Sequence, residues 1–460
     1  MANIVITTHW TGGDVYPFIR IGRRLLRRGH AVTVVTHAYY EPHVRQAGLA
    51  FAPIDTLDDW ETILHVNGPQ AVQMLDNLQS VTDQLEAHAD DPDRIFEIKQ
   101  IQREYEALRP LCLADDTVLV ARHGSSTTAM LLAEALRLPV VAVYMAPAMV
   151  LQPLLAESMI GPLMRDDLNR LRELFDLPPV SSWRRWVDGA RRSIGLWPAW
   201  FAEPEPQWPV NPLPVGFPLE NSRTTDAADL PPQVRGWLEQ GQPPVLISGG
   251  TSNMLRSGFY AASAAACQLL DVPALLVTQH RELLPETLPE RVVWGRAFDF
   301  ERIMPLMRAV IHHGGIGTLS QAMLAGVPQL VLAHGMDRPD NGARVRRVGC
   351  GDVLSFTKWQ PDQIALALEA ALAPGVRARC ADLAQDLRSY DPLEAAVDAI
   401  EQAMGDAAAR LDPAAFLADT RQPAPSGNGA ASGRPQAASK LAGLSPEQLA
   451  ALVRQVQRKR

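Results

Sequence analysis

Two adjacent histidines followed by a glycine-rich run are the residues of this chain best suited to chemistry. Residues 312–318 read His-His-Gly-Gly-Ile-Gly-Thr, and they lie between a short apolar run at 309–311 and a helix-forming run at 319–325. A glycine-rich turn from a buried strand into a helix lets backbone N–H groups approach an anion, and the positive end of the helix dipole favours the same negative charge. His313 adds a ring N–H donor. The turn predicts a phosphate site, although an ordinary glycine-rich connection would have the same composition.

A second polar loop follows one expected strand later. Ala-Gly-Val-Pro at 325–328 ends the helix, and residues 329–332 form another apolar run. The next segment, at 337–343, reads Asp-Arg-Pro-Asp-Asn-Gly-Ala and begins a helix that closes at 349–351. Asp337 then lies at the carboxyl end of a parallel strand, where it can accept hydrogen bonds from ligand hydroxyls. Phosphate donors on one loop and hydroxyl acceptors on the next predict a nucleotide-sugar pocket.

This order of motifs resembles the donor signature of the UDP-glycosyltransferase superfamily, whose members have the GT-B fold. The run Gly-Gly-Asp-Val-Tyr-Pro-Phe at 12–18 is similar to the acceptor-domain turn of the same family. The segments Leu-Trp-Pro-Ala-Trp-Phe-Ala at 196–202 and Gly-Phe-Pro-Leu at 216–219 resemble more particularly the catalytic subunit of rhamnolipid rhamnosyltransferases. The resemblance covers roughly residues 1–405. It implies an α/β protein with two Rossmann-like, doubly wound domains facing a cleft, of which the first binds the acceptor and the second the NDP-sugar.

Glycosyl transfer needs a base for the acceptor hydroxyl and stabilisation of the departing diphosphate. We expect His313 and the backbone amides of the glycine turn to hold the diphosphate, and Asp337 to hold sugar hydroxyls. The candidate donor-binding residues are Ser248, Gly250, Thr251, Phe298, His313, Gly315, Gly317, Thr318, Gln321, Asp337 and Arg338. The sequence has no paired acidic metal motif, so we expect no metal ligand and no cofactor besides the NDP-sugar co-substrate.

Asp14 is the first candidate for the catalytic base. It follows the first expected strand, and the resemblance places it where family members carry either His or Asp as the base. Asp14 could instead only cap the helix that follows it. His9, on the other arm of the same turn, is the second candidate, and a purely structural histidine is its alternative. His123 is a candidate acceptor contact, whereas Ser125 or Ser126 could simply cap a helix there.

Three departures from the family leave the donor undefined. The family often has Asp-Gln where this chain has Asp337 and Arg338, and arginine donates hydrogen bonds but accepts none. Either the sugar is unusual or Arg338 points away from it. Gln321 replaces a ribose-binding Glu, and the nucleobase motif Trp-x-Pro-Gln is absent, with Phe298 nearby. The nucleobase, uracil or thymine, therefore stays open.

Alternating strand and helix patterns predict two parallel-sheet domains. We place the first domain at 1–201, a proline-rich linker at 202–230 and the second domain at 231–405, with an irregular insertion at 145–195 inside the first. A chain of 460 residues is long enough for such a pair, and a net charge of −8 argues against a nucleic-acid partner. The four cysteines show no metal or disulfide spacing.

The carboxyl-terminal tail differs in composition. Residues 406–443 predict a disordered linker, and 444–460 predict a short amphipathic helix that begins with a capping box. That helix could dock a partner protein, touch a membrane surface or fold back on the enzyme. A second apolar stripe, from Trp183 to Ile194, predicts either an interfacial helix or a core-facing helix with a basic edge. Without a signal peptide or membrane-spanning run, we expect a cytoplasmic protein, with the inner membrane surface as a candidate location.

The sequence therefore predicts an inverting, metal-independent glycosyltransferase. Its acceptor would be a hydroxyl of a hydrophobic natural product, a glycolipid or a lipopeptide. Two alternatives remain open: a non-catalytic partner subunit of a glycosyltransferase, and a nucleotide-sugar epimerase. The sequence argues against a nicotinamide dehydrogenase, because neither turn has the Gly-x-Gly-x-x-Gly pattern.

Overall fold

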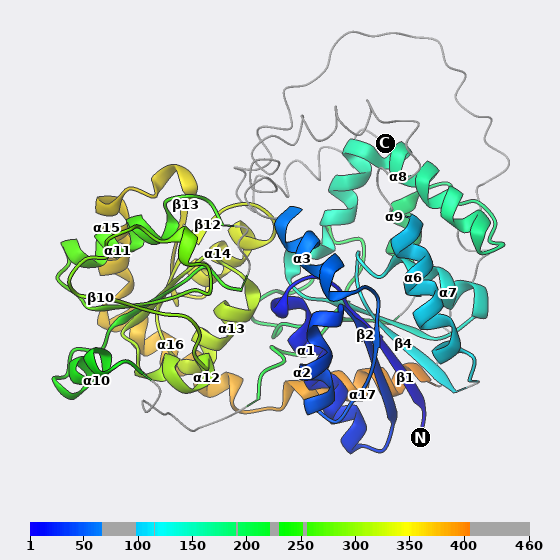
Figure 1. Ribbon diagram of the computed structural model, residues 1–460, viewed down its shortest axis with the longest axis horizontal. Coiled ribbons are helices and arrows are strands. Elements are labelled where there is room, and N and C mark those ends of the chain that lie inside the picture. The colour runs from blue at the N-terminus through cyan, green and yellow to red at the C-terminus, as the bar shows by residue number, and fades with distance from the viewer. Residues whose placement is uncertain (67–97, 115, 190–191, 221–229, 252–254, 405–460) are drawn as a thin grey trace, which may run out of the picture.

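The computed structural model describes residues 1–66, 98–114, 116–189, 192–220, 230–251 and 255–404. Within them the chain forms two parallel sheets, each flanked by helices, which lie side by side in Figure 1. We call the sheet of β1 to β7 with its helices the first domain, and the sheet of β8 to β13 with its helices the second domain. The expected α/β fold with two Rossmann-like domains is confirmed.

The first sheet has the strand order β3-β2-β1-β4-β5-β6-β7. Its strands are β1 (Asn3–Thr7), β2 (Ala31–Thr36), β3 (Ala50–Pro53), β4 (Thr117–Arg122), β5 (Val140–Tyr144), β6 (Arg192–Gly195) and β7 (Leu213–Pro214). Its helices are α1 (Gly12–Arg27), α2 (Glu41–Gln46), α3 (Leu57–Val66), α6 (Ile98–Leu108), α7 (Thr127–Leu136), α8 (Gln152–Leu174) and α9 (Trp183–Val187). The strands β1 to β3 are added toward one edge of the sheet and β4 to β7 toward the other, so the strand order reverses between β1 and β4. Ligands of open α/β sheets bind at such switch points, beyond the carboxyl ends of the strands.

The second sheet has the order β10-β9-β8-β11-β12-β13 and its own switch point between β8 and β11. Its strands are β8 (Val245–Ser248), β9 (Ala274–Val277), β10 (Val292–Gly295), β11 (Ala309–His312), β12 (Gln329–Ala333) and β13 (Gly351–Ser355). Its helices are α10 (Pro232–Glu239), α11 (Phe259–Leu269), α12 (Phe300–Ile303), α13 (Ile316–Ala325), α14 (Arg338–Arg347), α15 (Pro361–Ala371) and α16 (Pro374–Leu387). The glycine-rich turn after β11 therefore lies where a ligand is expected.

The segment 145–195 was expected to be irregular, and this is wrong. It contains the long helix α8, which is kinked at Ile160 (φ −132°), and the short helix α9. Trp183 and Trp186 on α9 are 7% and 0% exposed, and the Trp186 indole donates to Glu134 at 2.8 Å. α9 ends at Val187, and Ile194 belongs to β6. The core-facing alternative is thus correct for these tryptophans, and the interfacial one is wrong.

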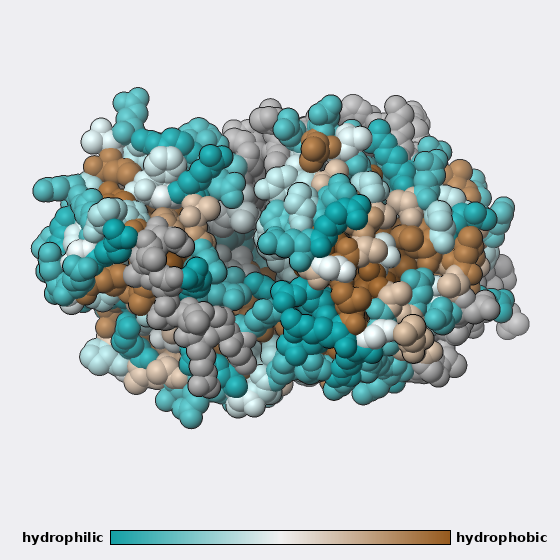
Figure 2. Space-filling model, turned by 60° about the horizontal axis from the view of Figure 1, so that its bottom comes forward, coloured by the Kyte–Doolittle hydropathy of each residue, from teal (hydrophilic) through white to brown (hydrophobic). Residues whose placement is uncertain are grey.

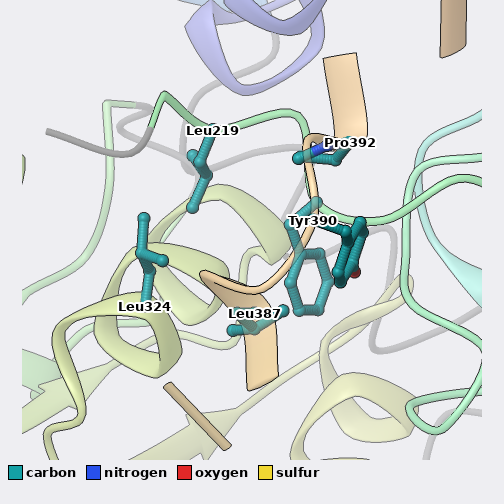
Figure 3. A pocket seen from close by; sticks show the side chains of 6 residues that line it. Leu219, Leu324, Leu387, Tyr390 and Pro392 are labelled. Atoms are coloured by element: carbon teal, nitrogen blue, oxygen red, sulfur yellow. The ribbon is translucent and has the colours of Figure 1, made fainter. Parts of the chain in front are cut away.

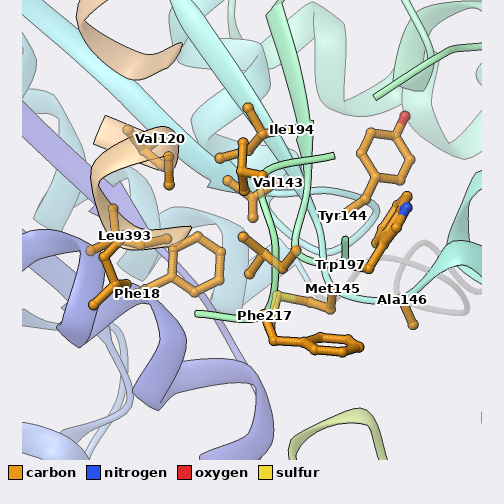
Figure 4. Close-up of a cluster of buried hydrophobic side chains, with 14 of the residues drawn as sticks. Phe18, Val120, Val143, Tyr144, Met145, Ala146, Ile194, Trp197, Phe217 and Leu393 are labelled. Atoms are coloured by element: carbon orange, nitrogen blue, oxygen red, sulfur yellow. The ribbon is translucent and has the colours of Figure 1, made fainter. Parts of the chain in front are cut away.

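The last described helix, α17 (Pro392–Met404), returns to the first domain and packs on α1, β4, β5 and β6. Asp391 caps it as expected, because its carboxylate accepts the backbone N–H of Leu393 at 3.0 Å. Leu393 lies in the same hydrophobic cluster as Phe18 and Val120 (Figure 4). Arg28, the C-cap residue of α1, binds three carboxylates of α17, those of Glu394, Asp398 and Glu401. α17 is therefore part of the first domain's core.

A small apolar pocket marks the place where the chain crosses between the domains. Its lining comes from the segment before α10, from α13 and from the end of α16 with its connection to α17 (Figure 3). The lining residues are Phe217, Leu219, Leu324, Leu387, Tyr390 and Pro392. The two segments that connect the domains thus pack against each other at this pocket.

Hydrophilic residues gather over the middle of the molecule in Figure 2, where the two lobes meet. None of the helices in the described part of the chain combines the length and apolarity needed to cross a bilayer. The predicted linker at 406–443 and the predicted helix at 444–460 lie outside the described residues.

Candidate active site

The two histidines at the end of β11 have different environments. His312 is fully buried, its Nε2 lies 2.9 Å from Gln329 Oε1, and its Nδ1 accepts the backbone N–H of Gly314 at 3.2 Å. Because Nδ1 accepts, Nε2 carries the proton, and burial lowers the pKa of His312 to about 4. His312 is therefore a neutral structural residue that shapes the turn.

His313 is held between two glycines. A Cβ added at Gly250 would meet His313 Cε1 at 2.6 Å, and one added at Gly315 would meet His313 Nε2 at 2.4 Å. Gly250 also has a left-handed φ of +84°, and its N–H donates to the Ser248 hydroxyl at 3.2 Å. Burial, followed by the charge of Arg338, lowers the pKa of His313 well below its usual value. The ring is therefore a neutral donor fixed between the β8 and β11 turns.

Asn341, on α14, joins the glycine turn to the expected sugar loop. Its Nδ2 donates to the Gly314 carbonyl at 3.0 Å and to Asp337 Oδ2 at 2.7 Å, and the residue is fully buried. One side chain thus fixes the distance between the expected phosphate and hydroxyl sites.

Buried polar atoms without a partner gather around this turn. Within the described part of the chain, His313 Nδ1, Gln321 Oε1 and Asn341 Oδ1 are buried and make no hydrogen bond. Nearly all buried polar groups in proteins are hydrogen-bonded, so such atoms at one place indicate a site that a polar ligand completes.

The other predicted donor residues lie along the same edge of the second sheet. Gly317 and Thr318 are half-buried in the first turn of α13. Thr251 is exposed at the end of the described β8 loop, and its carbonyl lies 3.3 Å from His280 Nε2. Phe298 packs against Gly295 beyond β10. Their roles toward a nucleotide stay predictions.

Asp337 and Arg338 occupy the boundary between β12 and α14. Burial raises the pKa of Asp337, and the negative charge of Asp14, in the first domain, raises it further, while Arg338 and Asn341 act in the opposite direction. Asp14 and Asp337 are thus close enough to interact. The two switch-point turns therefore face each other across the domain boundary.

Asp14 lies in the first turn of α1, three residues after the N-cap Thr11, so it is not the helix cap. The alternative that Asp14 only caps this helix is therefore wrong, because the two glycines already form its first turn. Arg122, at the end of β4, donates to Asp14 Oδ1 from Nε and lies equally close through Nη2, each at 2.9 Å. No bond to Asp14 Oδ2 is found within the described residues, which leaves that oxygen to a ligand hydroxyl.

His9 is buried against a carboxylate. Its Nε2 lies 3.0 Å from Glu104 Oε1, on α6, and its Nδ1 lies 3.3 Å from the Ser125 hydroxyl. Burial raises the pKa of Glu104, but the charge and hydrogen bond of His9 outweigh it, so that this pKa is lowered overall. Both ring nitrogens of His9 are engaged within the protein.

Trp10 has an unusual conformation in the same turn. Its φ of +77° is left-handed, which is rare for a bulky residue, and its side chain is 44% exposed. The backbone N–H of Trp10 donates to His37 Nε2 at 2.9 Å, and His37 Nδ1 lies 2.6 Å from Asp55 Oδ2. The His37–Asp55 pair thus fixes the backbone of Trp10, four residues before Asp14.

His123 lies in the interior of the first domain. It is 2% exposed, its ring stacks on Tyr144 at 3.9 Å between centroids, and its Nε2 lies 3.4 Å from Asp188. Ser126, which precedes α7, donates its hydroxyl to the Thr7 carbonyl rather than capping the helix. These contacts favour a structural role for His123, and acceptor binding by it stays a prediction.

Sequence reasoning did not single out Arg122 or Glu104, considered Ser125 only as a helix cap, and did not link Asn341 to the glycine turn. Glu104 belongs to a polar helical stretch that carries no motif, so nothing in the sequence linked it to His9. Asn341 could have been found, because it lies one helical turn after Asp337 and so on the same face of α14.

Comparisons with known proteins agree with this geometry. Residues 4–143 match the glycosyltransferase family 28 N-terminal domain, and residues 265–402 match the C-terminal domain of erythromycin biosynthesis protein CIII-like proteins. The chain belongs to the UDP-glycosyltransferase superfamily. It is a glycosyltransferase of the GT-B type, and each matched model covers one of its two domains.

Individual relatives align with this glycosyltransferase over most of its length. It is 28% identical over 419 residues to the O-mycaminosyltylonolide 6-deoxyallosyltransferase of Streptomyces fradiae, covering 84% of this chain and 92% of the relative. It is 24% identical over 454 residues to a sterol 3-beta-glucosyltransferase of Arabidopsis thaliana, covering 87% and 68%.

Solved structures share the fold of this glycosyltransferase. The calicheamicin glycosyltransferase CalG4 superposes with a TM-score of 0.61 at 21% identity, covering 88% of this chain and 98% of that one. The glycosyltransferase VinC, solved in complex with dTDP, superposes with a TM-score of 0.63 at 18% identity, covering 87% and 99%.

Proposed function

We propose that this glycosyltransferase transfers a sugar from an NDP-sugar to a hydroxyl of a hydrophobic natural product, glycolipid or lipopeptide, with inversion and without a metal ion. The observation that carries the proposal is the group of unpartnered buried polar atoms around His313. The nearby Asp337 is close enough to Asp14 of the first domain for that negative charge to raise its pKa. A diphosphate and a sugar supply the acceptors and donors that these atoms lack.

In this proposal Asp14 is the base. Arg122 occupies Oδ1 and orients the carboxylate, so that Oδ2 can take the proton of the acceptor hydroxyl. His9 is less well placed for this role, since Glu104 and Ser125 engage both of its nitrogens. With the base on the first domain and the diphosphate on the second, attack from the side opposite the leaving group gives inversion.

The acceptor class rests on the exposed Trp10 indole, four residues before Asp14 in the same turn. The name of one aligned relative, a sterol 3-beta-glucosyltransferase, points to a hydrophobic acceptor as well. dTDP and UDP are the nucleotides to test first, since VinC was solved with dTDP.

The first experiment measures thermal stabilisation of the full chain by a panel of UDP-, dTDP- and GDP-sugars, with His313→Ala as the comparison. A ligand at 100 times its Kd stabilises a protein by about 2.7 kcal/mol, a shift of several degrees. We expect one nucleotide to stabilise the wild type and not His313→Ala. If no member of the panel shifts the melting temperature, the transferase proposal is wrong.

The stabilising donor is then tested in turnover. Asp14→Asn should keep donor binding while kcat falls about 10²- to 10⁴-fold, whereas His9→Gln should lose much less. Unchanged activity of the whole pathway with Asp14→Asn would favour the non-catalytic subunit, and conversion of the donor without acceptor would favour the epimerase. Activity in EDTA and the anomeric configuration of the product test metal independence and inversion.

A further inference from the structure

Arg338, the first residue of α14, lies deep in the candidate donor site. Arg338 is only 9% exposed, and its Nη1 lies 3.4 Å from the His334 carbonyl oxygen, just after β12. A Cβ added at Gly314 would meet the Cβ and the carbonyl oxygen of Arg338, each at 3.0 Å. The base of the arginine therefore packs directly on the glycine turn that follows β11.

The positive charge of Arg338 acts on the same glycine turn. Burial is the main cause of the lowered pKa of His313, and the charge of Arg338 is the second. Burial lowers the pKa of Arg338 itself, and the charge of Asp337 only partly offsets this. Arginine stays charged in proteins, so the turn carries a fixed positive charge in addition to the α13 dipole. A buried cation at such a place is stabilised most by an anion with several oxygens.

We propose that Arg338 binds the diphosphate of the NDP-sugar, at the phosphate next to the sugar, and not a sugar hydroxyl. This rests on the proposed function. Asp337, the expected sugar contact, is its chain neighbour, and the Cβ and carbonyl oxygen of Arg338 pack on Gly314, the chain neighbour of His313. Arg338 therefore lies between the sugar and diphosphate positions.

The role in the reaction follows from where charge develops. The bond from the anomeric carbon to the phosphate oxygen breaks, and its electron pair stays on that oxygen. The acceptor oxygen forms the new bond to the anomeric carbon, and its proton goes to Asp14. A fixed guanidinium beside the departing oxygen stabilises the growing negative charge.

A carboxylate on the donor sugar would suit the same guanidinium, and the experiment separates the two anions. Titration calorimetry compares the full-length wild type, Arg338→Gln, Arg338→Lys and the control Arg346→Gln. Arg346 is on the same helix, but its side chain is exposed and pairs with Asp352. The probes are UMP, UDP, UDP-glucose and UDP-glucuronic acid, or the dTDP analogues if thymine is the base.

We expect Arg338→Gln to bind the nucleoside diphosphate about 10- to 100-fold more weakly. Binding of the monophosphate should change less than about threefold, because it lacks the second phosphate. Arg338→Lys should retain most of the affinity because it keeps the charge, and Arg346→Gln should match the wild type. In turnover, Arg338→Gln should lose about 10²-fold in kcat.

Unchanged diphosphate binding by folded Arg338→Gln, with a loss confined to UDP-glucuronic acid, would overturn the proposal in favour of a sugar carboxylate. If Arg338→Gln does not fold, Arg338→Lys decides: a loss as large for UMP as for UDP would also overturn it. A wild type that binds no nucleotide would overturn the proposed function itself, which is a different failure.

Discussion

The orientation of the His313 ring is set by glycines, which have no side chain. Two glycines from different turns touch its ring, one after β8 and one at the start of α13. The imidazole is therefore oriented before any ligand arrives, and none of the binding free energy is spent on ordering it. The glycines matter as space for the histidine as well as for backbone approach to an anion.

Gly250→Ala tests this arrangement. The new Cβ would collide with His313 Cε1 at 2.6 Å, so we expect the ring to move and nucleotide affinity to fall about tenfold or more. Gly258→Ala is the matched control, because Gly258 has nearly the same φ, +88°, but nothing within 4 Å of an added Cβ. Calorimetry with the stabilising nucleotide measures both. Equal losses in the two variants would mean that backbone strain, and not the histidine, is responsible.

His312 makes stability depend on pH. Its folded-state pKa is lowered from 6.5 to about 4 by burial. The unfolded chain takes up a proton below pH 6.5 and the folded chain does not, so stability falls as the pH is lowered from about 6.5 to 4, by roughly 3 kcal/mol in all. Urea unfolding at pH 6.5, 5.5 and 4.5 should show this fall, and His312→Gln should show less of it. His43→Gln, at an exposed histidine, should keep the wild-type slope; if it loses the same slope, the assignment to His312 is wrong.

The sequence predicted some of these residues and not their contacts. Asp14, His313 and Asp337 stand beside glycines and prolines at expected strand ends, where local patterns are informative. Glu104 reaches His9 from 95 positions away, and no local pattern can reveal such a pairing. Arg338 was recognised as a departure, but its burial under the glycine turn required the packing of α14.

At the scale of elements, several strands were predictable and one insertion was not. Short apolar runs such as 309–311 and 329–332 identify parallel strands, whereas the strand order, and with it both switch points, is set by tertiary pairing. The segment 145–195 suggested irregular structure because Pro147, Pro153 and Pro162 interrupt its pattern. The structure accommodates Pro153 near the start of α8 and Pro162 just after the kink, so α8 continues through both.

α17 gives a test at this scale. Ile400→Ala removes a fully buried side chain that packs in the first domain's core, and we expect a loss of about 2–4 kcal/mol in the free energy of unfolding. Gln402→Ala, on the exposed side of the same helix, should change it by less than about 0.5 kcal/mol. Hydrogen exchange should show lost protection in β4 to β6. Loss confined to β8 to β13 would contradict the packing described above.

At the scale of the molecule, the two domains are joined at a crowded point. Gly216 has a φ of +102°, and an added Cβ would lie 2.7 Å from Tyr390 and 2.8 Å from Pro392. The segment that leaves the first domain around Gly216 thus contacts the segment around Tyr390 and Pro392 that returns to it. Arg344 and Arg347 of α14 also donate to the Phe201 carbonyl, which ties the donor-side helix to the end of the first domain.

Gly216→Ala should therefore disturb both domains together. We expect a loss of about 2 kcal/mol or more in stability from strain and collision, and a lower kcat, since domain closure assembles such sites. Gly241→Ala provides the comparison, because its φ of +72° is also left-handed but an added Cβ meets nothing. Thermal unfolding and steady-state kinetics measure the two effects. If both variants behave alike, crowding at the crossing is unimportant.

The return of α17 also orders events during synthesis. The first domain leaves the ribosome early, yet Leu393, Val397 and Ile400 of its core are among the last described residues to emerge. The second domain has every strand of its sheet before α17 appears. The half of the protein that is made first is therefore the half that finishes folding last, and until then its sheet has an uncovered apolar face that a chaperone can bind.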